Sequence, residues 1–299
     1  MRMAQTKPNV HFLVGTGRCG SSLIHGILCR HPGVSFMSNL DDRLNGNAKV
    51  NALNPLLYRR LPPRFTEKGR VRFAPSEGYR ALQAEVSPAL VNPARDLTAA
   101  DLTPWLERRL VSFFARRAGV QTGDVFVHKL TGWPRVGFLK SAFPEGRFVQ
   151  IIRDGRAVAT SWLKMSWWLG YEGPQNWQWG PLPPLYQEAW ERSERSFVTL
   201  AGIGWLLLMD SWEKAKQTLP AGAWIEIRYE DFLSQPQSTI ETLESFLGLP
   251  HDIRTPKALT SFAVDETRGR RYLDDMGSDA LSELNDLLEV HLSRYGYDL

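Results

Sequence analysis

Residues 10–28 read VHFLVGTGRCGSSLIHGIL, and the central residues GTGRCGSS fit more than one kind of phosphate-binding loop. Gly15, Gly17 and Gly20 spell G-x-G-x-x-G, the dinucleotide-binding fingerprint, and the first and last of them also frame the G-x-x-x-x-G of a Walker A loop. A Walker loop continues with a lysine, but this chain has Ser21 in that place. The cation that would reach the terminal phosphates of a nucleotide is therefore missing.

A third interpretation takes the positive charge from Arg18, which lies inside the loop. The backbone N–H groups and the hydroxyls of Ser21 and Ser22 would then hold the phosphate. Residues 10–14 are typical of a buried strand, and residues 21–30 carry apolar side chains at helical spacing. The loop therefore opens a helix, whose free N–H groups and dipole favour an anion.

The composition narrows the class of protein. The chain has 299 residues, a formal charge of +4 and a pI near 9.1, a mild basic excess that is compatible with an anionic ligand and too weak to indicate nucleic-acid binding. Cys19 and Cys29 are too few for a disulfide framework, which indicates a reducing compartment. The polar start MRMAQTKPNV lacks the apolar core of a signal peptide, and no apolar run approaches the roughly 20 residues of a membrane span. We expect a soluble, cytoplasmic protein.

Strands and helices alternate along most of the chain. Beyond the first unit we expect strands at 125–128, 147–152 and 224–229 and helices at 103–117, 134–143, 154–164, 235–247 and 278–294. Residues 39–100 show weak periodicity, which indicates irregular structure with short helices. Strands that alternate with helices form a parallel sheet covered on both faces. The expected fold is a single α/β domain over residues 1–299, a P-loop-like three-layer sandwich with a central parallel sheet flanked by helices.

The stretch FVQIIRDGRAVATSW, residues 148–162, contains a second candidate phosphate site. Arg153 ends a strand, at the rim where open α/β sheets bind ligands, and Ser161 lies eight residues later, two turns along the next helix. A guanidinium and a hydroxyl so placed can hold one phosphate. The competing interpretation is that Arg153 pairs with a carboxylate such as Asp154.

Together these segments resemble the sulfotransferases that use 3′-phosphoadenosine 5′-phosphosulfate (PAPS). GRCGSSL, residues 17–23, is similar to the family loop that binds the 5′-phosphosulfate, and Arg153 with Ser161 matches the pair that binds the 3′-phosphate. IRYEDFLSQP, residues 227–236, resembles the segment whose tyrosine lies at the adenine, and TRGRRYLDD, residues 267–275, resembles the basic loop that closes over the 3′-phosphate. The resemblance implies nucleotide-binding roles for Arg18, Cys19, Gly20, Ser21, Ser22, Arg153, Ser161, Tyr229, Gly269 and Arg270.

The resemblance also implies the reaction. A sulfuryl group would pass in line from PAPS to a hydroxyl or amine of a small-molecule, lipid or glycan acceptor, leaving adenosine 3′,5′-bisphosphate (PAP). Negative charge grows on the departing phosphate, so positioning and electrostatic stabilisation should supply most of the catalysis. Lys129 matches a family lysine and, directly after the strand at 125–128, would point to the same site as Arg18. The transferred group carries less charge than a terminal phosphate, so we expect no metal ion.

The base that takes the proton of the acceptor is less evident. Family members use a His shortly after that lysine or a Glu after the first helix, but this chain has Thr131 and Asn39 near these places. A partly buried carboxylate or a neutral imidazole could replace them. The nearest candidates are Asp41 or Asp42, ranked first, and His128, ranked second. The alternative for each is an ordinary role as a helix cap, a loop carboxylate or a core histidine.

Tryptophans gather at positions 162, 167, 168, 177, 179 and 190, in a stretch rich in Gly and Pro that predicts an irregular loop. These rings either line a pocket for an aromatic or apolar acceptor or fill the space beneath the loop as core.

Other functions stay open at this point. An NAD-dependent oxidoreductase would use the G-x-G-x-x-G pattern with Asp41 or Asp42 at the ribose, but this leaves Arg18 and the pair of Arg153 and Ser161 unexplained. A nucleotide kinase fits less well, because the Walker lysine and a clear strand-terminal acid for magnesium are missing. A phosphonucleotide-binding module without catalysis would explain the absence of the usual base. The sequence contains no indication of oligomeric state.

Overall fold

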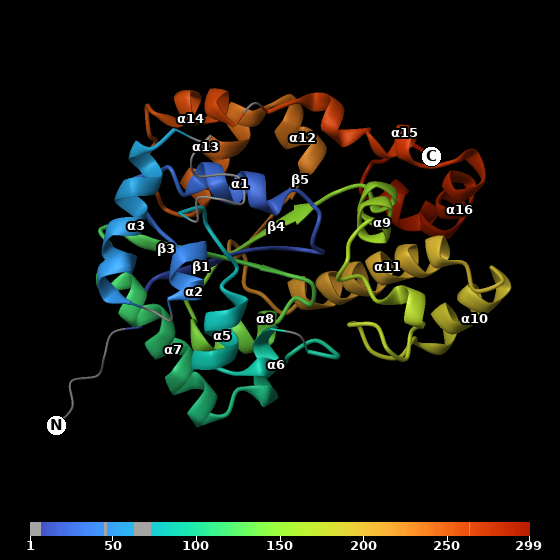
Figure 1. Cartoon of the computed structure of the whole chain (residues 1–299), viewed down its shortest axis with the longest axis horizontal. Coiled ribbons are helices and arrows are strands. Elements are labelled where there is room, and N and C mark those ends of the chain that lie inside the picture. The colour runs from blue at the N-terminus through green and yellow to red at the C-terminus, as the bar shows by residue number, and fades with distance from the viewer. Residues whose placement is uncertain (1–6, 45–46, 63–72, 92, 263) are drawn as a thin grey trace.

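The computed structural model describes residues 7–44, 47–62, 73–91, 93–262 and 264–299. At its centre lies a five-stranded sheet in the order β2-β3-β1-β4-β5, in which every neighbouring pair is parallel (Figure 1). The strands are β1 (Val10–Gly15), β2 (Val34–Ser35), β3 (Val125–Thr131), β4 (Phe148–Ile152) and β5 (Trp224–Arg228). Because all strands run in one direction, their carboxyl ends share one edge of the sheet, where open α/β folds bind ligands.

Helices surround the sheet (Figure 1). They are α1 (Ser21–Leu28), α2 (Asn39–Arg43), α3 (Ala48–Arg60), α5 (Tyr79–Glu85), α6 (Pro88–Val91), α7 (Pro104–Ala118), α8 (Val136–Ala142), α9 (Gly155–Leu163), α10 (Pro184–Arg192), α11 (Phe197–Lys216), α12 (Tyr229–Ser234), α13 (Pro236–Phe246), α14 (Thr255–Ser261), α15 (Tyr272–Asp275) and α16 (Ser278–Arg294). Short 3-10 turns are η1 (Ala99–Asp101), η2 (Gly170–Glu172) and η3 (Glu266–Gly269).

Two apolar clusters lie against the two faces of the sheet. On one face, strand side chains such as Leu13 and Val127 pack with α1, α12, α13 and α14. On the other face, Phe12 and Phe126 pack with α7, α8, α9, α11 and α16. Neighbouring strand residues thus point to opposite clusters, as the pleat of a strand requires. The three-layer α/β fold predicted from the sequence is confirmed.

Most of the predicted strands and helices are present, but α10, which carries Trp190, forms part of the segment that was predicted to be an irregular loop. Thr103 and Asp154 cap α7 and α9, because their side chains accept hydrogen bonds from backbone N–H groups in the first turn. β3 continues to Thr131 instead of ending at residue 128, so Lys129 is part of the strand. The 20-residue helix α11 and the short strand β2 have no counterpart among the predicted elements.

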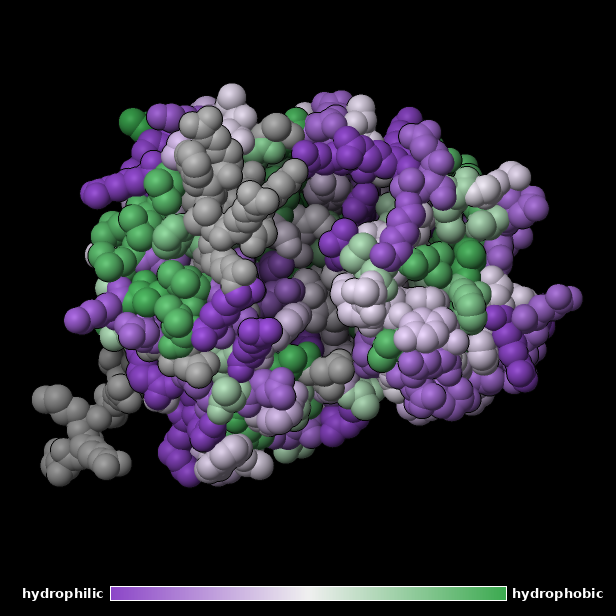
Figure 2. Space-filling view, viewed as in Figure 1, coloured by the Kyte–Doolittle hydropathy of each residue, from purple (hydrophilic) through white to green (hydrophobic). Residues whose placement is uncertain are grey.

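The face shown in Figure 2 is largely hydrophilic, and exposed leucines gather over and beside α3, on the left of that view: Leu44, Leu53, Leu56 and Leu57. Exposed apolar residues are common on protein surfaces, so this group alone assigns no function. No helix within the described ranges is long and apolar enough to cross a membrane.

Candidate functional site

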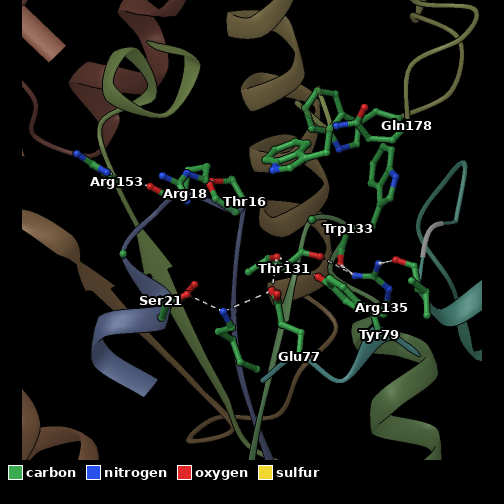
Figure 3. Close-up of a pocket in the computed structure, with 18 of the residues that line it drawn as sticks. Thr16, Arg18, Ser21, Glu77, Tyr79, Thr131, Trp133, Arg135, Arg153 and Gln178 are labelled. Carbon is green, nitrogen blue, oxygen red and sulfur yellow. Dashed lines mark hydrogen bonds and ion pairs between the residues drawn. The ribbon is translucent and has the colours of Figure 1, made fainter. Parts of the chain in front are cut away.

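A cavity of about 710 Å³ opens at the carboxyl ends of β1 and β3 (Figure 3). The loop between β1 and α1 forms one side of it, and Figure 3 shows Trp133 and Gln178 on the opposite side. Glu77 and Tyr79 line it from the segment that leads into α5. The predicted phosphate loop and part of the predicted aromatic segment therefore face one cavity.

The loop between β1 and α1 is wound by residues in the left-handed region. The φ angle is 81° at Gly17, 56° at Arg18 and 89° at Gly20. A non-glycine residue in this region typically costs about 1–3 kcal/mol, so the surroundings must hold Arg18 in place. A Cβ atom on Gly20 would lie 2.2 Å from the Tyr229 ring, which leaves room for glycine alone. The loop ends at the N-terminus of α1, where N–H groups and the helix dipole favour an anion.

Arg18 connects the two predicted phosphate sites. Its Nε donates to the Ser161 Oγ at 2.9 Å, and its backbone carbonyl accepts from the Arg153 Nη1 at 3.0 Å. Arg18 and Arg153 are 135 residues apart in the sequence. The fold therefore brings Arg18, Arg153 and Ser161 into one cluster beside the cavity.

The competing interpretation for Arg153, an ion pair with Asp154, is wrong. Asp154 pairs with Arg156 at 2.7 Å. In the described part of the chain, the hydrogen bonds of Arg153 go to the backbone carbonyls of Arg18 and Arg268, and its buried Nε has no partner. A guanidinium with an unused donor, beside a loop at a helix N-terminus, fits a bound phosphate.

Tyr229 and a C-terminal segment complete this end of the site. The Tyr229 ring lies 5.0 Å from the guanidinium carbon of Arg153. The carbonyl of Arg268 accepts from the Arg153 Nη2 at 2.9 Å. Of the two residues that the resemblance nominates here, Gly269 is buried and Arg270 is exposed to solvent. The contact with Arg153 is thus made one residue before Gly269 and two before Arg270.

The other loop residues differ in what they present to the cavity. Cys19 is fully buried in the apolar cluster below the loop and is not among the cavity-lining residues, so only its backbone can reach a ligand there. Gly20, Ser21 and Ser22 line the cavity. The Ser22 Oγ accepts a hydrogen bond from the Lys129 Nζ at 2.7 Å, which places a cation directly beside the loop.

The carboxylate of Glu77 lies next to Lys129, and the sequence pattern does not predict it as a site residue. The Lys129 Nζ lies 3.6 Å from the Glu77 Oε1, and the Thr131 Oγ1 donates to the same oxygen at 2.7 Å. The Tyr79 hydroxyl lies 3.2 Å from the Thr131 Oγ1. Of this group, the sequence identifies only Lys129 as a candidate, because Glu77 and Tyr79 belong to a stretch without a recognisable motif.

The predicted bases Asp41, Asp42 and His128 do not line the cavity, and that expectation is corrected. Asp41 is fully buried and pairs with Arg117 at 2.6 Å; burial raises the pKa of Asp41, and Arg117 opposes this shift. Asp42 accepts from the Ala81 N–H at 2.9 Å and so holds the first turn of α5. His128 points into the core, where burial holds its pKa well below the usual value. Each side chain is used by the fold.

The tryptophan-rich segment contributes both to the apolar core and to the wall of the cavity. Several rings belong to the apolar core: Trp162, Trp168, Trp177 and Trp190. Trp179 packs on this core, with its ring centroid 4.4 Å from that of Trp162, and also lines the cavity together with Gln178 and the exposed Trp167. The segment is therefore core on its inner side and cavity wall on its outer side.

Sequence comparison identifies one family. The model of the sulfotransferase family matches residues 11–253, a range that contains the loop after β1, the pair Arg153 and Ser161, and Lys129. No match was found among curated protein sequences.

Several solved sulfotransferase structures share this fold. The sulfotransferase STF9 from Mycobacterium avium has a TM-score of 0.61 at 13% identity, covering 98% of this chain and 78% of that one. The sulfotransferase domain from the curacin biosynthetic pathway has a TM-score of 0.54 at 13% identity, covering 99% and 100%. The sulfotransferase domain from the Synechococcus PCC 7002 olefin synthase has a TM-score of 0.52 at 15% identity, covering 100% and 98%. At such low identity, these likenesses show the shared fold.

Proposed function

Because the chain belongs to the sulfotransferase family and is a sulfotransferase, we propose that it transfers a sulfuryl group from PAPS to a hydroxyl or amine of a small-molecule acceptor. The meeting of Arg18, Arg153 and Ser161 beside one cavity carries this proposal. These residues come from two separate anion-binding segments. Such a pair suits a nucleotide with charged groups at both its 5′ and 3′ positions.

The donor is assigned an orientation from the same contacts. The 5′-phosphosulfate would lie against the loop at residues 17–22 and the N-terminus of α1. The 3′-phosphate would bind the hydroxyl of Ser161 and the Nε of Arg153, which has no hydrogen-bond partner among the described residues. The adenine would lie near Tyr229, and the segment with Gly269 and Arg270 would close over the 3′-phosphate.

The charges of the cavity suit an in-line displacement at sulfur. Negative charge grows on the bridging oxygen as the bond to sulfur breaks, and preorganised cations and N–H groups at that point lower the barrier. Arg18 lies in the loop, and Lys129 is hydrogen-bonded to the loop residue Ser22. Because these residues supply positive charge where it is needed, we propose that no metal ion takes part.

An aromatic or apolar acceptor is proposed from the composition of the far wall. Tyr79, Trp133, Trp167 and Trp179 line that part of the cavity. Aromatic rings contribute large apolar contact area to ligand sites, and a few polar groups among them fix the orientation of the ligand.

We further propose that residues 1–299 form a single domain that works in the cytoplasm. The family match and the solved structures span most of the chain. Cys19 and Cys29 are both buried free thiols, which suits a reducing compartment.

Two alternative functions, an NAD-dependent oxidoreductase and a nucleotide-binding module without catalysis, fit the structure less well. An NAD-dependent oxidoreductase would need Asp41 or Asp42 at a ribose, but Asp41 is committed to Arg117 and Asp42 to the first turn of α5. A nucleotide-binding module without catalysis has no need of the Lys129 and Glu77 pair at the cavity. Turnover with an added acceptor separates that module from the enzyme.

The proposed donor is tested by its product in a thermal-shift experiment. PAP should raise the melting temperature, because a ligand that binds only the folded state adds about 2.7 kcal/mol of stability at 100 times its Kd. Arg153→Ala should weaken PAP binding about 10- to 100-fold, since a hydrogen bond to a charged group contributes about 1.5–3 kcal/mol. Adenosine 5′-monophosphate lacks the 3′-phosphate and should lose far less affinity.

Arg192→Ala is the matched control, because Arg192 is an exposed arginine on α10 that pairs with Glu188. It should leave PAP binding unchanged. Stabilisation by NAD or ATP without stabilisation by PAP would refute the donor. Equal losses for PAP and adenosine 5′-monophosphate in Arg153→Ala would refute the role given to Arg153.

A further inference from the structure

Glu77 differs in its chemistry from the other described residues that line the cavity. Among the described residues that line the cavity it is the only acidic one, and none of them is a histidine or a cysteine. Its side chain is 21% exposed and stands beside Lys129 and Thr131 (Figure 3). An acceptor hydroxyl must lose a proton during transfer, and this carboxylate is within the cavity to take it.

The hydrogen bonds that reach Glu77 have one consistent direction. A carboxylate only accepts, so the Thr131 Oγ1 donates its proton to the Glu77 Oε1 at 2.7 Å. The Thr131 oxygen then accepts from the Tyr79 hydroxyl at 3.2 Å, because its own proton is already used. Burial raises the pKa of Tyr79, which keeps this hydroxyl protonated and able to donate. Two side chains therefore fix the orientation of the carboxylate.

These contacts leave one carboxylate oxygen available. Thr131 and Lys129 both approach Oε1, at 2.7 Å and 3.6 Å, whereas Oε2 accepts no hydrogen bond from the described residues. The Lys129 Nζ also donates to the Ser22 Oγ at 2.7 Å, where β1 leads into α1 through the loop that would hold PAPS, the donor loop. A single ammonium group thus stands between the carboxylate and the loop. An acceptor hydroxyl in the cavity would lie between a base and the sulfur that it attacks.

We propose that Glu77 is the general base and that Thr131 and Tyr79 position it, an inference that rests on the proposed transfer from PAPS. The proton of the acceptor hydroxyl passes to Oε2 of Glu77 as the acceptor oxygen forms its bond to sulfur. The bond between sulfur and the bridging oxygen breaks, and its electron pair leaves with the 5′-phosphate of PAP. The products are the sulfate ester, PAP and a protonated Glu77, which then releases its proton to solvent.

The variant Glu77→Gln tests this role, because it keeps the shape of the side chain and removes its basicity. Single-turnover hydrolysis of ³⁵S-labelled PAPS, with water as the acceptor, should slow by about 10²- to 10⁴-fold, and transfer to phenol should slow similarly. Transfer to 4-nitrophenol should slow much less, because this phenol gives up its proton readily. PAP should stabilise the variant as much as it stabilises the wild type.

The outcomes distinguish a failure of the proposal that Glu77 is the base from a failure of the proposal that PAPS is the donor. If Glu77→Gln binds PAP and still hydrolyses PAPS at the wild-type rate, Glu77 is not the base. An equal loss with phenol and 4-nitrophenol would also overturn the proposal. If PAP does not stabilise even the wild type, the proposed donor fails instead. Should neither phenol be sulfated by the wild type, the hydrolysis rates decide.

Substitutions at Thr131 test the positioning role. Thr131→Val removes the donor hydroxyl at nearly constant shape, and it should lower kcat about tenfold, the equivalent of one hydrogen bond, with little change in the KM for PAPS. Thr131→Ser keeps the hydroxyl and should restore most of the rate. Equal rates for the Val and Ser variants would mean that Thr131 only fills space.

The dependence of kcat on pH distinguishes a general base from a residue with a structural role, because only the loss of a base changes this dependence. Glu77 must be ionised to accept a proton, so kcat of the wild type should fall towards acid pH, and this limb should be absent from Glu77→Gln. The charged or titratable groups that face Glu77 are Lys129, Arg135 and Tyr79. An unchanged acid limb in Glu77→Gln would count against the proposal.

Discussion

His128 and Lys129 are neighbours in β3 with opposite surroundings. Successive side chains of a strand point to opposite faces, so Lys129 reaches the donor loop while His128 enters the core. The ring centroid of His128 lies 5.0 Å from that of Phe114 and 6.5 Å from that of Phe126. Both ring nitrogens are buried and find no hydrogen-bond partner among the described residues, which reduces stability. Proximity in the sequence to a catalytic lysine therefore does not make His128 a base.

The variant His128→Phe should raise the free energy of unfolding by about 1 kcal/mol, because it replaces two unpaired polar atoms with carbon in an aromatic cluster. Sulfuryl transfer should stay close to the wild-type rate. Denaturant unfolding and turnover measure the two effects. A large loss of turnover in a stable variant would return His128 to the list of candidate bases.

Asp41 illustrates how folding uses a residue that looks catalytic in the sequence. Its ion pair with Arg117 is almost completely excluded from solvent and joins α2 to α7. Removal of one partner from a buried pair typically costs about 3–5 kcal/mol of stability. If an Asp41 variant is inactive, the cause is therefore its lower stability, and its inactivity does not show that Asp41 acts as a base.

At the scale of elements, the unit of β1, loop and α1 is set by local sequence. The buried strand, the glycines that permit left-handed backbone, and the apolar spacing of the helix all lie within residues 10–28. This is why Arg18 and its neighbours could be nominated before the fold was known. Arg153 and Ser161 could be predicted for the same reason, since one directly follows β4 and the other lies on α9.

The place of Glu77 in the cavity could not be predicted from local sequence. Its segment is held in place by non-local contacts, namely the bridge between Ser38 and Pro75 and the hydrogen bond between Tyr79 and Thr131 of β3. Neither contact leaves a periodicity or a motif in the sequence. The strands, the caps and the two phosphate segments are thus readable from the chain itself, and the far wall of the cavity depends on tertiary structure.

The junction of the donor loop with α1 can be tested at Gly20. Gly20→Ala must adopt a φ of 89° and must also displace the Tyr229 ring, which lies 2.2 Å from the added Cβ. Gly222→Ala has a similar φ of 78°, and the added Cβ would have no neighbour within 4 Å in the described part of the chain, so this variant carries the backbone cost alone. We expect about 1–2 kcal/mol of destabilisation from the backbone in both, and a further loss of stability and at least a tenfold weaker binding of PAP in Gly20→Ala.

Thermal unfolding with and without PAP compares the two glycine variants. Equal melting temperatures and equal PAP affinities would mean that the contact of Gly20 with Tyr229 has no part in shaping the site.

At the scale of the whole molecule, buried histidines make stability depend on pH. Burial lowers the pKa of His11 from 6.5 to about 4 and that of His25 to about 3, and it holds the pKa of His128 well below 6.5. The unfolded chain therefore binds protons below pH 6.5 that the folded chain does not. The stability contributed by these neutral histidines is fully present above pH 6.5 and is lost as the pH falls towards their folded values.

The free energy of unfolding should accordingly drop by ~1.4 kcal/mol per buried histidine for each pH unit below the value of 6.5. Denaturant titrations at pH 7.5, 6.5 and 5.5 measure this slope. His128→Phe should reduce this slope, because it removes one of the buried imidazoles. A constant free energy of unfolding across this range would contradict the expectation.

The guanidinium of Arg153 joins distant parts of the chain, since it donates to the carbonyls of both Arg18 and Arg268. A ligand that fixes this guanidinium strengthens both contacts, and by linkage an ordered C-terminal segment strengthens the ligand. During synthesis on the ribosome, the loop and α1 emerge about 250 residues before Arg268. A nascent chain should therefore bind nucleotide at full strength only once Arg268 has left the ribosome.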